Sequence, residues 1–371
     1  MNDGKRSMPD LKALRIAVLG AGAVGGYIGG HLARAGYRVV LVDAWAEHVE
    51  HIRAHGIRLT DPLGSIVVPA EAMHLHQVQA FVRDPVDIAL VCTKSYDTAW
   101  TAMLIRPYLR ADGCVVSVQN SLNEDEIAGI VGADRTMGCI ASTISVSATG
   151  PGVIERARTP GGDAYTVFRV GEMHGRVTPR ALAVAAILSA VDSAKVTSNL
   201  WGERWAKLVT NSMHHGILGA AGISDHQLMQ NAPTRLLAIR CAGEAIRVAQ
   251  ALGHELEPIL RMPAALWCAA ADGETAALDQ IDAGWRKWME RSREPHYGSV
   301  GHDLAKGRRT EIDYTCGYVA ARGAQAGQPA PTHAALAAMV KRVERGELVR
   351  GMHNLDVLMN QEARPNTEAG S

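Results

Sequence analysis

The sequence predicts an α/β protein in which a doubly wound N-terminal sheet is followed by a C-terminal all-α domain. Three observations predict this fold. A short apolar strand, Leu14–Gly20, runs directly into the glycine-rich turn Gly20–Gly25, which is typical of the entry to a Rossmann-like domain. Further apolar strands then alternate with helical stretches. From Asn199 to about Leu348 the pattern is mostly helical, with long Ala- and Leu-rich stretches.

The elements of the sheet domain follow one another in regular alternation. In chain order we expect strand 14–20, helix 26–35, strand 37–42, helix 45–55, strand 86–92 and strand 114–118. The first helix ends where Gly36 offers a natural stop. The second strand ends at Asp43. This alternation is what parallel strands joined by crossover helices require.

The composition excludes several classes of protein. Of the 371 residues 47% are hydrophobic and 20% charged, close to the average of soluble globular proteins. Lys plus Arg and Asp plus Glu number 38 each, so the formal net charge is zero and nothing favours a nucleic-acid or membrane partner. Six cysteines without a CxxC pair are typical of reduced thiols, and no segment has the pattern of a signal peptide or transmembrane helix. We therefore expect a cytoplasmic protein.

The glycine-rich turn has the spacing of a dinucleotide-binding fingerprint. Gly20 permits the tight turn, Gly22 lets the backbone approach a pyrophosphate, and Gly25 lets the helix pack close to the strand. The pyrophosphate would lie at the helix N-terminus, where free N–H groups favour an anion. The residues between these glycines, Ala23 and Val24, complete the expected turn.

Asp43 stands where a carboxylate would accept hydrogen bonds from the adenosine ribose. A carboxylate there repels a 2′-phosphate, so Asp43 favours NAD(H) and leaves NADP(H) as the alternative. We accordingly divide the chain into a flexible leader (1–13), a dinucleotide-binding domain (14–195), a helical domain for substrate binding and dimerisation (196–350) and a loose tail (351–371). A homodimer through the helical domain is compatible with this division.

A second polar signal lies on a helix of the C-terminal domain. Lys207 and Asn211 are one turn apart on the helix that begins near Trp201, with His214 and His215 just beyond them. Their neighbours are apolar, so we expect the helix to be largely buried and its lysine to need a partner. A later segment, 299–314, contributes Ser299 and Glu311, with Thr310 as a candidate N-cap.

With these pieces in order, the chain resembles the ketopantoate reductase (2-dehydropantoate 2-reductase) family over residues 14–348. The resemblance rests on Gly20–Gly25, Thr93-Lys94, Val118-Gln-Asn120, Lys207-Leu-x-x-Asn211, and Ser299 followed by Thr310-Glu311-Ile-Asp313. It implies a Rossmann domain and a helical domain with the active site in the cleft between them.

The resemblance implies three catalytic residues. Lys207 would be the general acid that protonates the ketone oxygen as hydride arrives from the nicotinamide, and Glu311 would contact the same hydroxyl. Asn120 would hold the substrate and orient the lysine, beside the cofactor. The chemistry agrees, because hydride addition to a ketone leaves an alkoxide that a positioned cation can neutralise.

The resemblance also implies binding residues. Asn211 would bond the distal polar group of the substrate, Ser299 would bind its carboxylate, and Lys94 would lie near the adenosine end of the cofactor. No metal is implied. One turn beyond Asn211 the family has a second asparagine that grips the substrate hydroxyl, whereas this chain has His215. We therefore expect His215 in the substrate site and a substrate that is ketopantoate or a bulkier 2-oxo acid.

Three further features depart from the family or lie outside its motifs. Ser121 replaces the glycine that usually follows Gln-Asn, which is tolerable if the turn needs no positive φ. The stretch before Ser299 is longer than usual and contains Trp267, Trp285 and Trp288. They form either a lid or an enlarged apolar substrate pocket, or else an extra helical layer that packs its own core or a dimer contact; we favour the second interpretation. On the helix after Asp43, His48, His51 and His55 share a face that we expect to be solvated rather than metal-binding.

The sequence thus predicts NAD(P)H-dependent reduction of a 2-oxo acid to a 2-hydroxy acid. One alternative is an NAD-dependent dehydrogenase that oxidises a different secondary alcohol. Another is a non-catalytic nicotinamide-binding sensor, against which the joint presence of Lys207, Asn120 and Glu311 argues.

Overall fold

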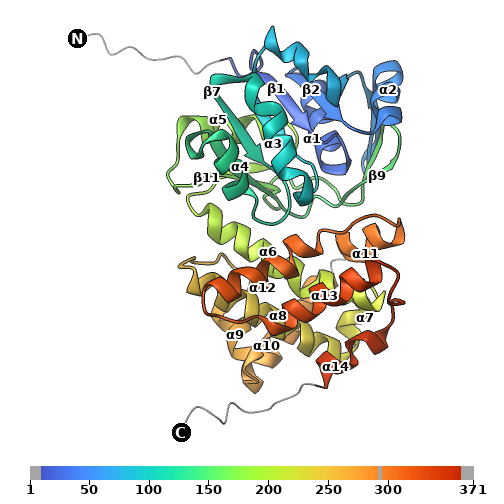
Figure 1. Cartoon of the computed structure of the whole chain (residues 1–371), viewed down its shortest axis with the longest axis vertical. Coiled ribbons are helices and arrows are strands. Elements are labelled where there is room, and N and C mark those ends of the chain that lie inside the picture. Colours follow the sequence, from blue (N-terminus) through green and yellow to red (C-terminus); the bar gives the residue numbers. More distant parts are fainter. Residues whose placement is uncertain (1–9, 291–294, 361–371) are drawn as a thin grey trace, which may run out of the picture. The chain divides into compact units, whose positions relative to one another are not determined.

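The computed structural model describes residues 10–290 and 295–360, except for the side chain of Trp288. The chain divides into two compact units, one ending at Leu200 and the other beginning at Trp201. Figure 1 colours the first unit blue to green and the second yellow-green to red. Within the described residues, no helix has both the length and the hydropathy needed to cross a membrane.

The first unit is built on two sheets, which confirms the predicted α/β class. The large sheet has the strand order β12-β11-β8-β7-β6-β1-β2-β5 and the small one β4-β3-β10-β9. The strands are β1 (Arg15–Leu19), β2 (Arg38–Asp43), β3 (Ile57–Asp61), β4 (Gly64–Val68), β5 (Glu71–His74), β6 (Val86–Val91), β7 (Leu109–Ser117), β8 (Thr136–Ala141), β9 (Val146–Gly150), β10 (Val153–Arg156), β11 (Phe168–Glu172) and β12 (Ala194–Val196). The helices are α1 (Ala23–Arg34), α2 (Ala46–His55), α3 (Thr98–Ile105), α4 (Glu124–Val131) and α5 (Pro179–Leu188).

The order of the central strands fixes where a ligand can bind. β1 pairs in parallel with β2 on one side and with β6 on the other, and β7 continues the parallel run. The chain therefore reverses its direction of winding at β1, and ligands of such sheets bind beyond the carboxyl ends of the strands at that point. Both faces of β1 are buried: Ile16 and Val18 belong to one core, and Ala17 and Leu19 to the other. This explains the continuous apolar run that predicts the strand.

The first helix, α1, is packed closely on two sides. On one side a Cβ placed at Gly29 would lie 2.2 Å from Leu41 of the large sheet. On the other, a Cβ at Gly30 would lie 3.0 Å from Leu59 of the small sheet. A methyl group at either position would push a leucine side chain aside, so the glycines of α1 let it lie between the two sheets at close range.

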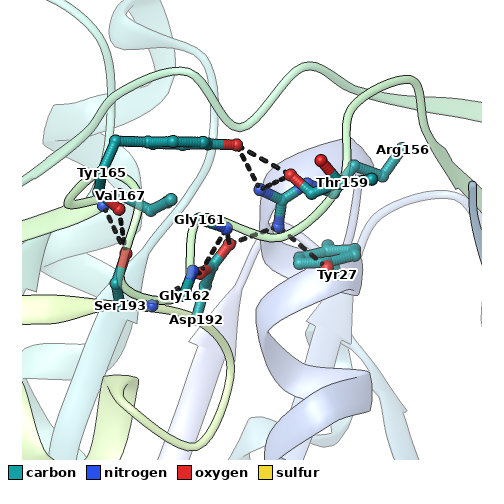
Figure 2. Close-up of polar contacts among 9 residues, drawn as sticks. All are labelled: Tyr27, Arg156, Thr159, Gly161, Gly162, Tyr165, Val167, Asp192 and Ser193. Carbon is teal, nitrogen blue, oxygen red and sulfur yellow. Dashed lines mark hydrogen bonds and ion pairs between the residues drawn. The ribbon is translucent and has the colours of Figure 1, made fainter. Parts of the chain in front are cut away.

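A buried ion pair ties α1 to the end of the first unit (Figure 2). The Arg156 guanidinium is 2.6 Å from the Asp192 carboxylate and donates to the Tyr27 hydroxyl at 3.0 Å. The backbone N–H groups of Gly161 and Ser193 also donate to Asp192, at 2.9 and 2.6 Å. Burial raises the pKa of the Asp192 carboxyl, but these donors outweigh it, so the pKa lies below the ordinary aspartate value. The segment after β10 is thereby held against α1.

The second unit consists of helices. They are α6 (Leu200–Ala221), α7 (Asp225–Gln230), α8 (Ala232–Ala251), α9 (Ala264–Ala271), α10 (Thr275–Met289), α11 (Gly298–Ala305), α12 (Cys316–Gln325), α13 (Pro331–Glu344) and α14 (Asp356–Met359). Glu244 of α8 accepts hydrogen bonds from the first N–H groups of α13, those of Thr332 and His333, at 3.0 and 3.2 Å. The buried His333 ring in turn joins Glu244 at 2.9 Å to the Ser212 hydroxyl of α6 at 3.1 Å. This network fixes α6, the helix that carries the expected catalytic lysine.

The tryptophan-rich stretch forms an extra helical layer. Trp267 and Trp285 are fully buried, and their rings meet edge to face with centroids 5.6 Å apart. Both therefore belong to the core of this unit, as the second of the two interpretations expects. Trp288 completes the expected face, but its side chain lies outside the described residues.

Candidate active site

The glycine-rich turn has the backbone geometry that close approach to an anion requires. Gly20 has φ +89° and its N–H donates to Val42 at 2.8 Å; a Cβ there would lie 2.8 Å from the Thr93 nitrogen. A Cβ at Gly25 would lie 1.9 Å from the Gly20 carbonyl oxygen. Around Gly22, by contrast, the space is open. The turn is therefore closely packed at Gly20 and Gly25 and open at Gly22, where a ligand would need room.

The start of α1 offers the matching donors. Gly22 is the N-cap of α1, and no side chain caps it. Ala23 and Val24 are the first two helical residues, whose N–H groups have no acceptor within the helix. Free N–H groups and the helix dipole favour a phosphate there, so this part of the unit fits the pyrophosphate of a dinucleotide.

Asp43 holds the turn in place. Its carboxylate accepts the Ala21 N–H at 2.6 Å and the Trp45 N–H at 2.8 Å. Each carboxylate oxygen can accept a further bond, so the half-exposed group also has capacity for a ribose hydroxyl. Sequence reasoning predicts only the ribose role and misses this structural one, which depends on the distance between the turn and the end of β2.

His48 corrects one expectation from the sequence. The solvated face proposed for His48, His51 and His55 is wrong for His48, whose side chain is completely buried. Its Nε2 lies 2.9 Å from the Ala21 carbonyl, and its Nδ1 accepts the Gly152 N–H at 2.9 Å. The partner Gly152 comes from the small sheet, about a hundred residues later, which helical spacing alone does not reveal.

Lys94 and Asn120 lie at the same edge of the large sheet. Lys94 follows β6 and Asn120 follows β7, and these strands are parallel neighbours. The two loops are tied together, because the Gln119 side-chain amide donates to the Thr93 carbonyl at 3.1 Å and the Asn120 carbonyl accepts from Ser95 at 3.2 Å. The half-buried Asn120 is therefore on a fixed loop.

The condition under which Ser121 would be easily tolerated, a turn without positive φ, is not met. The residue has φ +67°, in the left-handed region that favours glycine. It is only 4% exposed, and its hydroxyl has no hydrogen-bond partner among the residues that the structure describes. The serine beside Asn120 thus carries both backbone strain and an unpaired buried hydroxyl.

The second unit presents a polar stripe on an otherwise buried helix. Lys207 and Asn211 of α6 are half-exposed, one turn apart, while Leu208, Val209 and Met213 beside them are buried. An amphipathic surface helix would expose far more of its circumference. The accessible part of α6 therefore includes these two expected site residues.

His215 and Ser299 are brought together by the fold. His215 on α6 and Ser299 on α11 meet at 3.3 Å, between Nδ1 and the hydroxyl oxygen. Gly298 permits the approach, because a Cβ there would lie 3.0 Å from the His215 ring. Two residues that the sequence separates by 84 positions therefore form one polar contact.

His214 points elsewhere. Its Nδ1 bonds the Thr210 carbonyl at 2.8 Å and its ring meets Trp285 edge to face, with centroids 5.2 Å apart. Burial lowers the pKa of His214 to about 4. The neutral, buried His214 therefore packs against Trp285 in the helical unit, whereas His215 contacts Ser299.

Glu311 is buried at the start of a short 3₁₀ turn (Ile312–Tyr314). Its carbonyl accepts the N–H of Tyr314 at 3.0 Å, and the Thr310 hydroxyl accepts the N–H of Ile312 at 3.2 Å. The expectation that Thr310 caps a helix here is wrong: the N-cap is Glu311, the element is a single 3₁₀ turn, and the Thr310 hydroxyl accepts a local bond two residues along the chain.

Comparisons with known proteins agree on one family. The ketopantoate reductase PanE/ApbA model matches residues 16–168, and the C-terminal model of the same family matches residues 199–344. A 2-dehydropantoate 2-reductase of Halobacterium salinarum is 27% identical over 336 residues, covering 90% of this chain and 99% of that protein.

Solved structures give the same picture of the fold. A PanE/ApbA family ketopantoate reductase from Ralstonia eutropha has a TM-score of 0.72 at 26% identity, covering 90% of this chain and 99% of the other. A D-mandelate dehydrogenase, solved with NADH and anilino(oxo)acetate, has a TM-score of 0.73 at 23% identity and the same coverage. The second likeness is one of fold alone.

Proposed function

We propose, from the premise that this chain belongs to the ketopantoate reductase family, that it reduces a 2-oxo acid to a 2-hydroxy acid with Lys207 as the general acid. Membership of the family makes the cofactor a nicotinamide dinucleotide. The observation that carries the proposal is the half-exposed pair Lys207 and Asn211 on the buried helix α6, with the contact between His215 and Ser299 beyond it.

The proposed reaction consists of a hydride transfer and a proton transfer. The dinucleotide supplies the hydride to the carbonyl carbon, which leaves the negative charge on the oxygen. Lys207 then gives its proton to that oxygen, and Glu311 and Asn120 orient the lysine and the substrate. The products are a 2-hydroxy acid and the oxidised nicotinamide.

Binding is the task of the other proposed residues. The Ser299 hydroxyl would donate to the substrate carboxylate and Asn211 would bond the distal polar group. Gly20, Gly22, Ala23, Val24 and Gly25 would hold the pyrophosphate, and Lys94 and Asn120 would line the same sheet edge. Asp43 favours NAD over NADP, because its carboxylate would lie against a 2′-phosphate.

The substrate we propose is ketopantoate or a bulkier 2-oxo acid. An imidazole occupies the position of an asparagine, and it contacts Ser299, the proposed carboxylate ligand. His215 would therefore change both the shape and the polarity of the site. We further propose that the enzyme works in the cytoplasm, where its six free cysteines would stay reduced.

Initial rates of nicotinamide absorbance change test the proposal. Ketopantoate and a series of bulkier 2-oxo acids would be assayed with NADH and with NADPH, and 2-hydroxy acids with NAD for the reverse direction. Lys207→Ala is the catalytic control, checked for unchanged dinucleotide affinity and circular dichroism. We expect turnover that falls about a hundredfold or more in Lys207→Ala.

Two outcomes would contradict the proposal. Turnover that survives Lys207→Ala would remove the lysine from the mechanism. Tight dinucleotide binding without turnover of any 2-oxo acid or 2-hydroxy acid would favour the alternatives, a dehydrogenase for another secondary alcohol or a sensor.

A further inference from the structure

Trp45 is an exposed aromatic residue at the cofactor edge of the large sheet. β2 ends at Asp43, and Trp45 two residues later is the N-cap of α2. Its side chain is 37% exposed. The carboxylate of Asp43 joins it to the glycine-rich turn, since Asp43 binds the N–H groups of both Ala21 and Trp45.

One side of the Trp45 ring is backed by a buried imidazole. The rings of Trp45 and His48 are stacked, with centroids 5.1 Å apart and an angle of 8° between their planes. His48 is one turn along α2 and completely buried. The indole therefore lies flat on a fixed support and is exposed beyond it.

The support is fixed because both nitrogens of His48 are engaged. The Gly152 N–H can only donate, so Nδ1 is the acceptor and Nε2 carries the hydrogen that is given to the Ala21 carbonyl. Burial lowers the pKa of His48, which agrees with a neutral ring. Asp43 thus accepts a hydrogen bond from the Ala21 N–H, and His48 donates one to the Ala21 carbonyl. Trp45 contacts Asp43 through its backbone N–H and His48 through its ring.

We propose that Trp45 is the stacking platform for the adenine of the cofactor. This inference shares one assumption with the proposed function, namely that the ligand is a nicotinamide dinucleotide. With the pyrophosphate at the N-terminus of α1, the adenosine half extends over the end of β2, because β2 lies on one side of β1 and the nicotinamide half belongs to β6 and β7 on the other. A rigid indole at that edge offers the purine a π-face, the usual mode by which aromatic side chains bind bases.

Binding measurements with parts of the cofactor test the inference. Dissociation constants would be measured for NADH, for ADP-ribose, and for reduced nicotinamide mononucleotide, which lacks the adenosine. The variants are Trp45→Ala and Trp45→Phe. Trp100→Ala is the matched control, since Trp100 is 38% exposed and lies on α3 of the same unit.

We expect Trp45→Ala to weaken the binding of NADH and of ADP-ribose by the same factor, about tenfold to a hundredfold. The affinity for the reduced mononucleotide should stay unchanged. Trp45→Phe should recover most of the loss, and Trp100→Ala should bind all three ligands like the wild type. Unchanged NADH affinity in Trp45→Ala would overturn the inference. An equal loss of affinity for the mononucleotide would also overturn the inference, because the substitution would then act by distorting the glycine-rich turn.

These measurements separate the inference from the proposed function, because none of them needs turnover. Failure to reduce any 2-oxo acid would overturn the proposed function and leave an adenine-dependent loss in Trp45→Ala intact. Efficient turnover of a 2-oxo acid, together with unchanged dinucleotide affinity in Trp45→Ala, would support the proposed function and overturn the role of Trp45.

Discussion

Replacing Ser121 by glycine should stabilise the N-terminal unit. Ser121 has φ +67°, a conformation that costs a residue with a Cβ about 1–2 kcal/mol. Its buried hydroxyl, unpaired within the described part of the chain, costs about 1–3 kcal/mol more. Glycine removes both penalties, but it lowers the free energy of unfolding by about 0.5–1 kcal/mol because it increases the entropy of the unfolded chain. We therefore expect Ser121→Gly to raise the free energy of unfolding by about 1–4.5 kcal/mol.

The assay is reversible denaturant unfolding followed by circular dichroism, with a thermal scan beside it. For a unit of this size each kcal/mol corresponds to about 2–4 °C, so the midpoint should rise by about 2–18 °C. Ser121→Ala is the matched control, because it removes the hydroxyl and keeps the strained backbone. It should fall short of Ser121→Gly by about 1 kcal/mol. If Ser121→Gly is no more stable than the wild type, the reasoning from strain and burial is refuted.

The remaining predictions concern charge and packing. Asp43→Asn should raise the ratio of kcat/KM for NADPH to that for NADH about tenfold, because the 2′-phosphate no longer faces a carboxylate; an unchanged ratio would count against the proposed cofactor preference. Asp192→Asn should destabilise the first unit by about 3–5 kcal/mol in denaturant, since it leaves the buried guanidinium of Arg156 without its counter-charge. Because the pKa of Asp192 is lowered in the fold, its stabilising effect is complete above the ordinary aspartate pKa and disappears as the pH falls through the folded value; the acid-induced loss of stability should be smaller in Asp192→Asn. Trp285→Ala should cost the helical unit about 3–5 kcal/mol, measured in the same way, and Trp285→Phe clearly less.

The fold class could be predicted because its signals are local. The strand before Gly20, the glycine spacing and the strand ending at Asp43 lie within one stretch of chain, and each has the pattern that its structure requires. The small sheet could not be predicted in this way. Its strand β10 pairs with β3, so that Ile154 lies opposite Leu59, and nothing in either short segment indicates a partner so far along the chain.

The same limit explains what helical spacing alone leaves open. Helical spacing places His48 and His214 correctly on their helices, but it does not say which face is buried. That depends on Gly152 in one case and on Trp285 in the other, both contributed by distant segments. The positive φ of Ser121 is hidden for a different reason, because serine is not a residue that normally indicates the left-handed region. The roles of the proposed site residues stay predictions.

The close packing of α1 between two sheets limits how this unit can be re-engineered. A methyl group at Gly25 would lie 1.9 Å from the Gly20 carbonyl oxygen, and one at Gly29 would lie 2.2 Å from Leu41, so neither position accepts a larger residue without movement of its neighbours. This packing holds the N–H groups at the start of α1 in position. A library designed to change dinucleotide preference should leave 20–30 untouched and vary 43–47, where the chain turns from β2 into α2: Asp43 is half-exposed there and residues 44–47 are exposed.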